Sequence, residues 1–418
     1  MKARHSVLSI LFATWIVSSV DRMAMSVALP YIATDFHLNA LESGLLLSAF
    51  FAGYSISQIP GGMLADVFGV KRVATAAMLW WSIFTAITGV VGSFGHMLVA
   101  RFVFGLGEGV FPACAFKTIA VWFPRRERAT ANAVMLASNP LGAALSPLIV
   151  VAIMAAWGWR TVFLVLLVPG LLIAFLFWRF VPDSPSASGR VTPQERNEIE
   201  GEDEPGETLA GRASFVDVLK EPSILKYFLV LFAFDIAFWG FTAWLPTYLV
   251  KARGFSMVQM GITASLPFFA GTVGSVLGGW ISDRYFKHDR RIPIVATQLI
   301  SALFLYLTFT AKSVVMMVIC QTIAGFFLMT FFSTFWALPM NTVPKALMGM
   351  ASGLINMAGQ IAAFVSPLLL GVIVQATGGS FDLSFLLLIA ALVLSSAIVM
   401  TIKGGDRSLL HDEVRDRA

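Results

Sequence analysis

A motif that joins two long apolar runs occurs twice in this chain. It reads P-G-G-M-L-A-D-V-F-G-V-K-R at Pro60–Arg72 and L-G-G-W-I-S-D-R-Y-F-K-H-D-R-R at Leu277–Arg291. Its two aspartates, Asp66 and Asp283, lie 217 positions apart in a chain of 418 residues. Three pairs of prolines repeat at nearly the same offset: Pro30 and Pro246, Pro124 and Pro344, Pro147 and Pro367. Duplication on this scale in an apolar chain predicts two equivalent halves, an arrangement typical of secondary transporters.

The composition predicts a membrane protein. Hydrophobic residues make up 57% of the chain and charged residues 13%, whereas a soluble domain carries about 25% charged residues. The length accommodates about twelve membrane-spanning helices of about 20 residues each. We therefore predict an all-α membrane protein with two pseudo-symmetric bundles of six transmembrane helices. The apolar runs place these helices near 6–34, 43–67, 71–93, 97–122, 128–156, 160–180, 223–250, 257–283, 291–311, 313–342, 346–377 and 381–402.

The distribution of lysine and arginine predicts the orientation. With both termini in the cytoplasm, 22 of the 29 Lys and Arg residues fall on the cytoplasmic side and four on the opposite side. This bias favours cytoplasmic termini, and it accounts for the basic pI without any need for nucleic-acid binding. The expected domains are a six-helix bundle at 1–180, a cytoplasmic central loop at 181–222, a second six-helix bundle at 223–402 and a cytoplasmic tail at 403–418.

The central loop is broken by prolines and contains two short helical patterns. Thr192-Pro193-Gln194-Glu195 has the spacing of a capping box, in which Thr192 and Glu195 cap the first turn of a helix reciprocally. Ser214–Lys220 is a second candidate helix, lying at the membrane surface. A solvated linker with short helices accounts for both patterns.

Six charged residues fall inside the predicted transmembrane helices: Asp21, Arg22, Arg101, Glu108, Lys117 and Asp235. Charges at this depth are costly and indicate function unless they only hold helices together. Arg101 and Glu108 are seven residues apart, which places them on one helix face about 10 Å apart. Lys117 alternatively snorkels to the membrane surface. All five histidines lie outside the predicted transmembrane helices, so Asp21 and Glu108 are the best candidates for proton carriers, with a nearby arginine controlling their charge.

The repeated motif predicts a pair of conformational clamps. Asp66 and Asp283 lie in the last turns of their helices, where the helix dipole disfavours an acid. Each therefore needs a positive partner, such as Arg72 or the N-terminus of another helix. Gly62 and Gly279 are expected to allow close helix contact, and Gly69 suits a helix end. The predicted clamp residues are Gly62, Asp66, Gly69, Arg72, Gly279, Asp283 and Arg284.

Several segments carry a resemblance to a known family. They are Asp21-Arg22, the run Ala49–Arg72, R-F-V-F-G-L-G-E at Arg101–Glu108, W-F-P-R-R-E-R-A at Trp122–Ala129, W-L-P-T-Y-L-V-K-A-R-G at Trp244–Gly254, Trp336 and Asn356. On these segments the chain resembles the major facilitator superfamily, over all of its length except the central loop and tail. Within that superfamily it is similar to the anion:cation symporter branch, which includes bacterial carriers of galactonate, glucarate and hexuronates.

The resemblance implies proton-driven uptake of an organic monoanion, with protons as coupling ions and no other cofactor. By similarity, Asp21 and Glu108 carry protons, and Arg101 tunes them. Arg22 binds the substrate carboxylate. The remaining residues assigned to the substrate site by similarity are Ser19, Tyr54, Gln58, Trp336 and Asn356. Tyr54 and Trp336 are equally well explained as core aromatics, and we expect a monomer in the lipid bilayer with no metal.

The sequence also departs from the branch. Ser19 stands where sugar-acid carriers tend to have a tyrosine, and Leu231 where they often have a glutamine. Asp235 follows one turn later; it is a third proton site, a ligand for a substrate amine or the partner of a basic residue. A less hydroxylated carboxylate therefore fits as well as a sugar acid. Proton-coupled efflux of a drug-like or cationic compound is the main alternative, although the helix 5 pattern of many exporters is missing at Asn139–Pro147. A channel or sensor on the same scaffold is a further alternative, and we find no motif of an enzyme.

Overall fold

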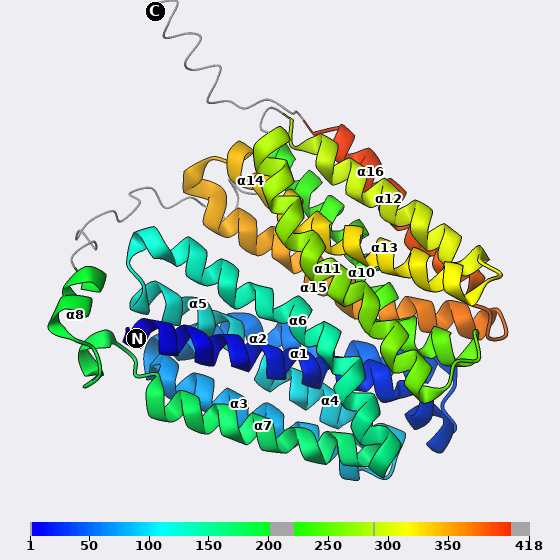
Figure 1. The fold of residues 1–418 in the computed structure, drawn as a ribbon, viewed down its shortest axis with the longest axis horizontal. Coiled ribbons are helices and arrows are strands. Elements are labelled where there is room, and N and C mark those ends of the chain that lie inside the picture. Colours follow the sequence, from blue (N-terminus) through cyan, green and yellow to red (C-terminus); the bar gives the residue numbers. More distant parts are fainter. Residues whose placement is uncertain (1, 201–220, 287–288, 403–418) are drawn as a thin grey trace, which may run out of the picture. The chain divides into compact units, whose positions relative to one another are not determined.

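The computed structural model describes residues 2–200, 221–286 and 289–402. Twelve helices in this part of the chain are long and apolar enough to cross a membrane, and the predicted all-α fold with twelve such helices is confirmed. The chain forms two compact units (Figure 1). The first takes in the described residues up to 200 together with Ala243–Ser265, and the second takes in those from 221 to Thr242 and from Leu266 to 402. The domain boundaries at 180 and 222 stay a prediction.

The first unit is built from the N-terminal helices. They are α1 (Ala3–Asp35), α2 (Ala40–Phe68), α3 (Val70–Val90), α4 (Phe94–Glu108), α5 (Phe111–Trp122), α6 (Arg125–Trp157), α7 (Trp159–Phe180), the 3₁₀ helix η1 (Pro185–Ala187) and α8 (Pro193–Glu200). In this unit α1 packs on α6, α2 on α4, and α3 on α7. The predicted helix at 214–220 and the tail at 403–418 lie outside the described residues.

The remaining helices lie in the second unit, apart from the end of α10 and the start of α11, which belong to the first. They are α10 (Pro222–Lys251), α11 (Met257–Tyr285), α12 (Arg291–Thr310), α13 (Val314–Phe335), α14 (Ala337–Thr342), α15 (Lys345–Ala376) and α16 (Asp382–Met400). Here α12 packs on both α13 and α16. Buried polar contacts join α12 to α16: Gln298 donates to Ser395 at 2.7 Å and accepts from Ser396 at 2.7 Å.

Two of the predicted transmembrane helices, one in each half, are broken within their length. The helix predicted at 97–122 divides into α4 and α5 after Glu108, and the one predicted at 313–342 divides into α13 and α14 at Trp336. A proline explains each break, since Pro112 cannot donate to the Glu108 carbonyl and Pro339 cannot donate to the Phe335 carbonyl. Two residues assigned to the site by similarity, Glu108 and Trp336, thus lie at broken ends of helices, where side chains can reach a ligand.

Glycines bring α2 and α4 into direct backbone contact. A Cβ atom at Gly53 would overlap the carbonyl oxygen of Phe102, and one at Gly105 would overlap that of Phe50. Such close approach requires residues without side chains. This contact fixes the register of the two helices. Phe50 and Tyr54 of α2 therefore face Arg101 of α4 and Glu108 at the end of that helix.

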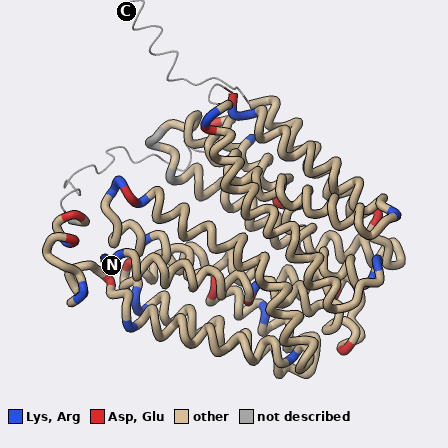
Figure 2. Tube along the Cα trace, viewed as in Figure 1, with Lys and Arg blue, Asp and Glu red and all other residues tan. Residues whose placement is uncertain are grey.

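Charged residues lie mostly at the ends of the helices, with few along their length (Figure 2). Large apolar side chains, by contrast, are exposed along the helices, as for Ile59, Val67 and Val168. A surface of this kind suits lipid rather than water. The few charges within the bundle therefore stand out as the places to look for a functional site.

Candidate functional site

A buried ion pair joins α1 to the end of α4 in the first unit. Arg22 of α1 donates from Nη2 to Oε1 of Glu108 at 2.6 Å, and the hydroxyl of Ser18 donates to the same oxygen at 2.6 Å. Glu108 is 1% exposed. It ends α4, where the helix dipole disfavours an acid, so the pair with Arg22 offsets both burial and dipole. The other oxygen of Glu108, Oε2, has no hydrogen-bond partner among the described residues.

Two further charged residues are buried beside this pair with little hydrogen bonding. Asp21 is fully buried, and neither of its carboxylate oxygens has a partner in the described part of the chain. Arg101 and Glu108 are its main electrostatic neighbours. Arg101 is 1% exposed, and its Nε and Nη1 have no hydrogen-bond partner among the residues that the structure describes. Its guanidinium instead lies over the ring of Phe104, 4.4 Å from the centroid, which partly compensates a buried cation.

Aromatic side chains of α2 surround Arg22. Its guanidinium carbon lies 5.3 Å from the ring centroid of Tyr54 and 5.4 Å from that of Phe50. The hydroxyl of Tyr54 lies against Arg22 and Gln58. The structure thus brings six of the residues named from the sequence to one place in the first unit: Asp21, Arg22, Tyr54, Gln58, Arg101 and Glu108.

Two polar residues of this cluster were not anticipated. Ser18 lies one turn before Arg22 on α1, and Asn139 of α6 accepts a hydrogen bond from Ser19 at 2.7 Å. Gly142 allows this contact, because a Cβ atom there would press on Ser19. Helical spacing from Arg22 was a signal that could have found Ser18. No pattern in the sequence indicated that Ser19 would bond to Asn139.

The second unit holds the other residues assigned by similarity. Trp336 is half-buried between α13 and α14, with its ring 5.6 Å from that of Phe335. Asn356 of α15 is exposed. Asp235 of α10 is 4% exposed, and its Oδ1 has no partner among the described residues. The roles of these residues stay predictions.

The repeated motif is paired differently from the expectation. Asp66 binds Lys117 of α5 at 2.7 Å, and Lys117 also donates to the Ala65 carbonyl at 3.0 Å; Arg72 is exposed. Lys117 therefore supplies positive charge both to the acid and to the carbonyl end of α2. In the second copy Asp283 binds Arg290 at 2.8 Å rather than Arg284.

The glycines of the motif differ from the expectation in their register. A Cβ atom at Gly62 or Gly279 would make only ordinary contacts, whereas one at Gly61 would come within 2.7 Å of Val110 Cα and one at Gly278 within 2.9 Å of Ser333 Oγ. The first glycine of each pair, not the second, faces the neighbouring helix. Gly69 ends α2 with a φ of 82°, which favours glycine.

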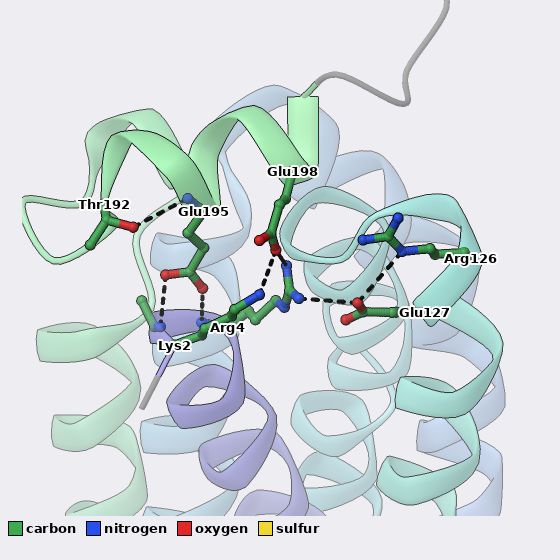
Figure 3. Close-up of polar contacts among 8 residues, drawn as sticks. Lys2, Arg4, Arg126, Glu127, Thr192, Glu195 and Glu198 are labelled. Carbon is green, nitrogen blue, oxygen red and sulfur yellow. Dashed lines mark hydrogen bonds and ion pairs between the residues drawn. The ribbon is translucent and has the colours of Figure 1, made fainter.

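A polar clasp joins α8 to the start of α1 (Figure 3). Its core is Arg4, 3% exposed, which donates to Glu198 of α8 and to Glu127 of α6, both at 3.0 Å. Lys2 also donates to Glu198, at 2.6 Å. The Lys2 ammonium and the Arg4 guanidinium hold the pKa of Glu198 below its ordinary value. We define this clasp as Lys2, Arg4, Glu127, Glu195 and Glu198.

The predicted capping box at the start of α8 is only half formed. The backbone N–H of Glu195 donates to the Thr192 hydroxyl at 3.2 Å, as expected. The Glu195 carboxylate, however, accepts from the N–H groups of Ala3 and Arg4, both at 3.0 Å. It caps α1 instead of α8, because the first turn of α1 offers two unsatisfied N–H groups and a favourable dipole.

Comparisons with known proteins show what the chain is similar to. The sequence profile of the Major Facilitator Superfamily matches residues 10–367. The probable sulfoacetate transporter SauU of Cupriavidus necator is 36% identical over 93% of this chain and 91% of its own length. The hexuronate transporter of Bacillus subtilis is 30% identical over 96% and 94%. Among solved structures, a bacterial homologue of the human lysosomal transporter Spinster superposes with a TM-score of 0.78 at 19% identity, covering 95% of this chain and 96% of that one.

Proposed function

Because the chain belongs to the major facilitator superfamily, we propose that it imports a small organic anion together with protons by alternating access. The resemblance found in the sequence is confirmed, and the chain is a multi-pass transporter of the bacterial inner membrane rather than an enzyme. Proton coupling and the class of substrate are the parts proposed here.

The observation that carries the proposal is the ion pair between Arg22 and Glu108. An entering carboxylate or sulfonate competes with Glu108 for the Arg22 guanidinium, which binds either anion in the same way. When the substrate takes Arg22, Glu108 is left buried with the hydroxyl of Ser18 as its only protein partner in the described chain. An isolated ionised carboxylate is too costly to bury, so Glu108 takes up a proton. Substrate binding and proton binding are thereby coupled.

The charges of the cluster also set the charge of the substrate. Asp21 and Glu108 offset Arg22 and Arg101 when all four are ionised. Uptake of one proton gives the cluster a single net positive charge, which a monoanion neutralises. Uptake of two protons gives it two positive charges, which a small dianion neutralises. Both kinds of anion occur among the substrates named for the relatives, since a hexuronate carries one acidic group and sulfoacetate carries two.

The surroundings of Arg22 favour a small, sparsely hydroxylated anion. Ser19 is already hydrogen-bonded to Asn139, and Phe50 and Tyr54 cover the guanidinium with aromatic rings. A sugar acid needs several polar groups to pair its hydroxyls, because unpaired polar groups in a closed site are costly. We therefore propose a short sulfonated or carboxylated acid in preference to a polyhydroxylated one.

The test is uptake into proteoliposomes that contain the purified protein. Labelled sulfoacetate and glucuronate are offered with an inward proton gradient, without a gradient, and with a gradient plus protonophore. We expect gradient-driven accumulation of sulfoacetate that the protonophore abolishes. Arg22→Ala should lose this uptake, while Arg160→Ala, which removes an exposed arginine paired with Asp35, should keep it. Uptake of neither acid, combined with proton-coupled efflux of a lipophilic cation, would overturn the proposal.

A further inference from the structure

Asp235 interrupts an apolar face of α10. Leu231, Phe234, Asp235 and Phe238 have the spacing of one helix face. Phe234 stacks on Phe331 of α13 with ring centroids 3.6 Å apart, and it meets Phe332 edge to face at 5.3 Å. The carboxylate of Asp235 is thus embedded in an aromatic and aliphatic contact between helices of the second unit.

The packing of α15 makes room for this carboxylate. Gly359 lies against Oδ2 of Asp235, and a Cβ atom at Gly359 would overlap that oxygen. Gly359 lies one turn after Asn356, so Asp235 meets α15 beside a residue assigned to the substrate site by similarity. Oδ1 is buried and lacks a hydrogen-bond partner in the described chain.

A cation to neutralise Asp235 is missing from the neighbouring sequence. Between Val314 and Pro344, which spans α13 and α14, and between 346 and 376 of α15 there is no charged residue. On α10 itself Lys226 lies nine residues earlier, about 13 Å along the axis, and donates to the Thr401 carbonyl.

The charged side chains that the structure describes on α11, α12 and α16 lie at the ends of these helices or beside them. On α11 and α12 the charged groups gather at the ends, where Asp283 binds Arg290 and Arg291 binds Asp289. Asp382 begins α16. The hydroxyl of Tyr227 is hydrogen-bonded to Thr342.

The first unit contains a counterpart of this residue. Asp21 lies nine residues before Pro30 of α1, and Asp235 lies eleven residues before Pro246 of α10. These two prolines are one of the pairs that mark the duplication. Each half therefore buries an acid at a similar position of its first helix, and in the described chain at least one oxygen of each acid lacks a hydrogen-bond partner. The two differ in their surroundings, since Asp21 has Arg101 as an electrostatic neighbour and Asp235 has aromatic rings.

We propose that Asp235 is a second proton-binding site of the transporter, separate from the cluster around Arg22. The proton comes from water and binds a carboxylate oxygen of Asp235 as the side chain becomes buried. It returns to water when the same oxygen is exposed on the other side of the membrane. The idea rests on the proposed proton symport for its role in transport, but proton binding at Asp235 is a property of the purified protein alone.

The first measurement needs no substrate. Infrared spectra of the purified protein are titrated with pH, and the carbonyl band of protonated carboxyl groups is followed. We expect Asp235→Asn to remove part of this band at neutral pH, where an aspartate in water is ionised. Asp382→Asn, which removes an exposed acid of the same unit, should leave the band unchanged. An unchanged band in a correctly folded Asp235→Asn protein overturns the proposal.

The second measurement separates this proposal from the proposed function. The number of protons moved per labelled sulfoacetate is measured in proteoliposomes, and it should fall by one in Asp235→Asn while Asp235→Glu keeps the original value. An equal stoichiometry in Asp235→Asn and the unsubstituted protein would refute a coupling role. Transport that never responds to a proton gradient, in a protein that still shows the Asp235 band, contradicts proton symport but not proton binding at Asp235.

Discussion

Glu108 accepts from Arg22 and from Ser18 through the same oxygen, Oε1, which leaves Oε2 buried without a hydrogen bond in the described chain. The two donors lie one turn apart on α1, so a single helix holds the last residue of α4. A movement of α1 relative to the end of α4 therefore breaks both hydrogen bonds together. The protonation of Glu108 is thereby tied to a change in helix packing.

Replacing Glu108 by glutamine should separate transport from proton coupling. The amide keeps the size of the side chain but cannot bind or release a proton, so accumulation driven by a pH gradient should be lost. Exchange of labelled for unlabelled substrate should persist, because it needs no net proton movement. Both are measured in proteoliposomes with sulfoacetate. A Glu108→Gln protein that still concentrates the acid under a proton gradient would show that the proton role belongs elsewhere.

Removing Arg22 should destabilise the protein as well as stop transport. Arg22→Ala leaves Glu108 buried without its partner, and breaking a buried ion pair in this way costs about 3–5 kcal/mol. The double variant Arg22→Ala/Glu108→Gln removes the stranded acid and should recover most of that loss of stability. Thermal unfolding of the two proteins in the same detergent gives the comparison. If the double variant is no more stable than the single one, the pair is not the reason for the loss.

A methyl group at Gly105 should separate α2 from α4. The Cβ atom of Gly105→Ala would overlap the Phe50 carbonyl, and overpacking of this kind costs about 1–3 kcal/mol. It also shifts Phe50 away from Arg22 and should weaken substrate binding. Gly95→Ala is the matched control on the same helix, since nothing lies within 4 Å of a Cβ atom there. Equal thermal stability of the two variants would contradict the close contact.

The polar clasp should weaken in acid. The pKa of Glu198 is held below its ordinary value of 4.5, chiefly by the hydrogen bond from Lys2. A group whose pKa is lowered by folding stabilises fully above its ordinary pKa and loses that contribution as pH falls through the lowered value. Hydrogen exchange of residues 193–200 should therefore accelerate below about pH 4.5. In the variant Glu198→Gln, residues 193–200 should exchange fast at every pH. If exchange in this variant depended on pH as it does in the unsubstituted protein, Glu198 would be excluded as the source of the pH dependence.

The sequence predicted the helices and most of the first unit's charged cluster for a clear reason. Twenty-residue apolar runs specify transmembrane helices directly, and a charge inside such a run is visible at once, as for Asp21, Arg22, Arg101 and Glu108. Ion pairs between residues far apart in the sequence were harder to predict. Asp66 has the positive partner that its helix end demands, but Lys117, 51 positions away, takes the place expected for Arg72. Only the packing of α5 on α2 decides between them.

Contacts that depend on helix rotation were also missed. Ser19 donates a hydrogen bond to Asn139 of α6, and Gly61 rather than Gly62 faces Val110. Successive residues of a helix point about 100° apart, so an error of one position changes which residue makes the contact. The capping box at Thr192 was predicted, but the Glu195 carboxylate caps α1 instead of α8. Its local pattern was correct, but two N–H donors nearly two hundred residues earlier in the chain, those of Ala3 and Arg4, bind the carboxylate instead.

The cap that Glu195 places on α1 has a consequence for biosynthesis. Chains fold from the N-terminus as they leave the ribosome, and Glu195 is made only after all helices of α1 to α7 have been translated. Until then Glu195 cannot cap the first turn of α1, and Arg4 lacks its partner Glu198. The cap on the first helix therefore depends on a segment that is translated after α7 and before the helices of the second half.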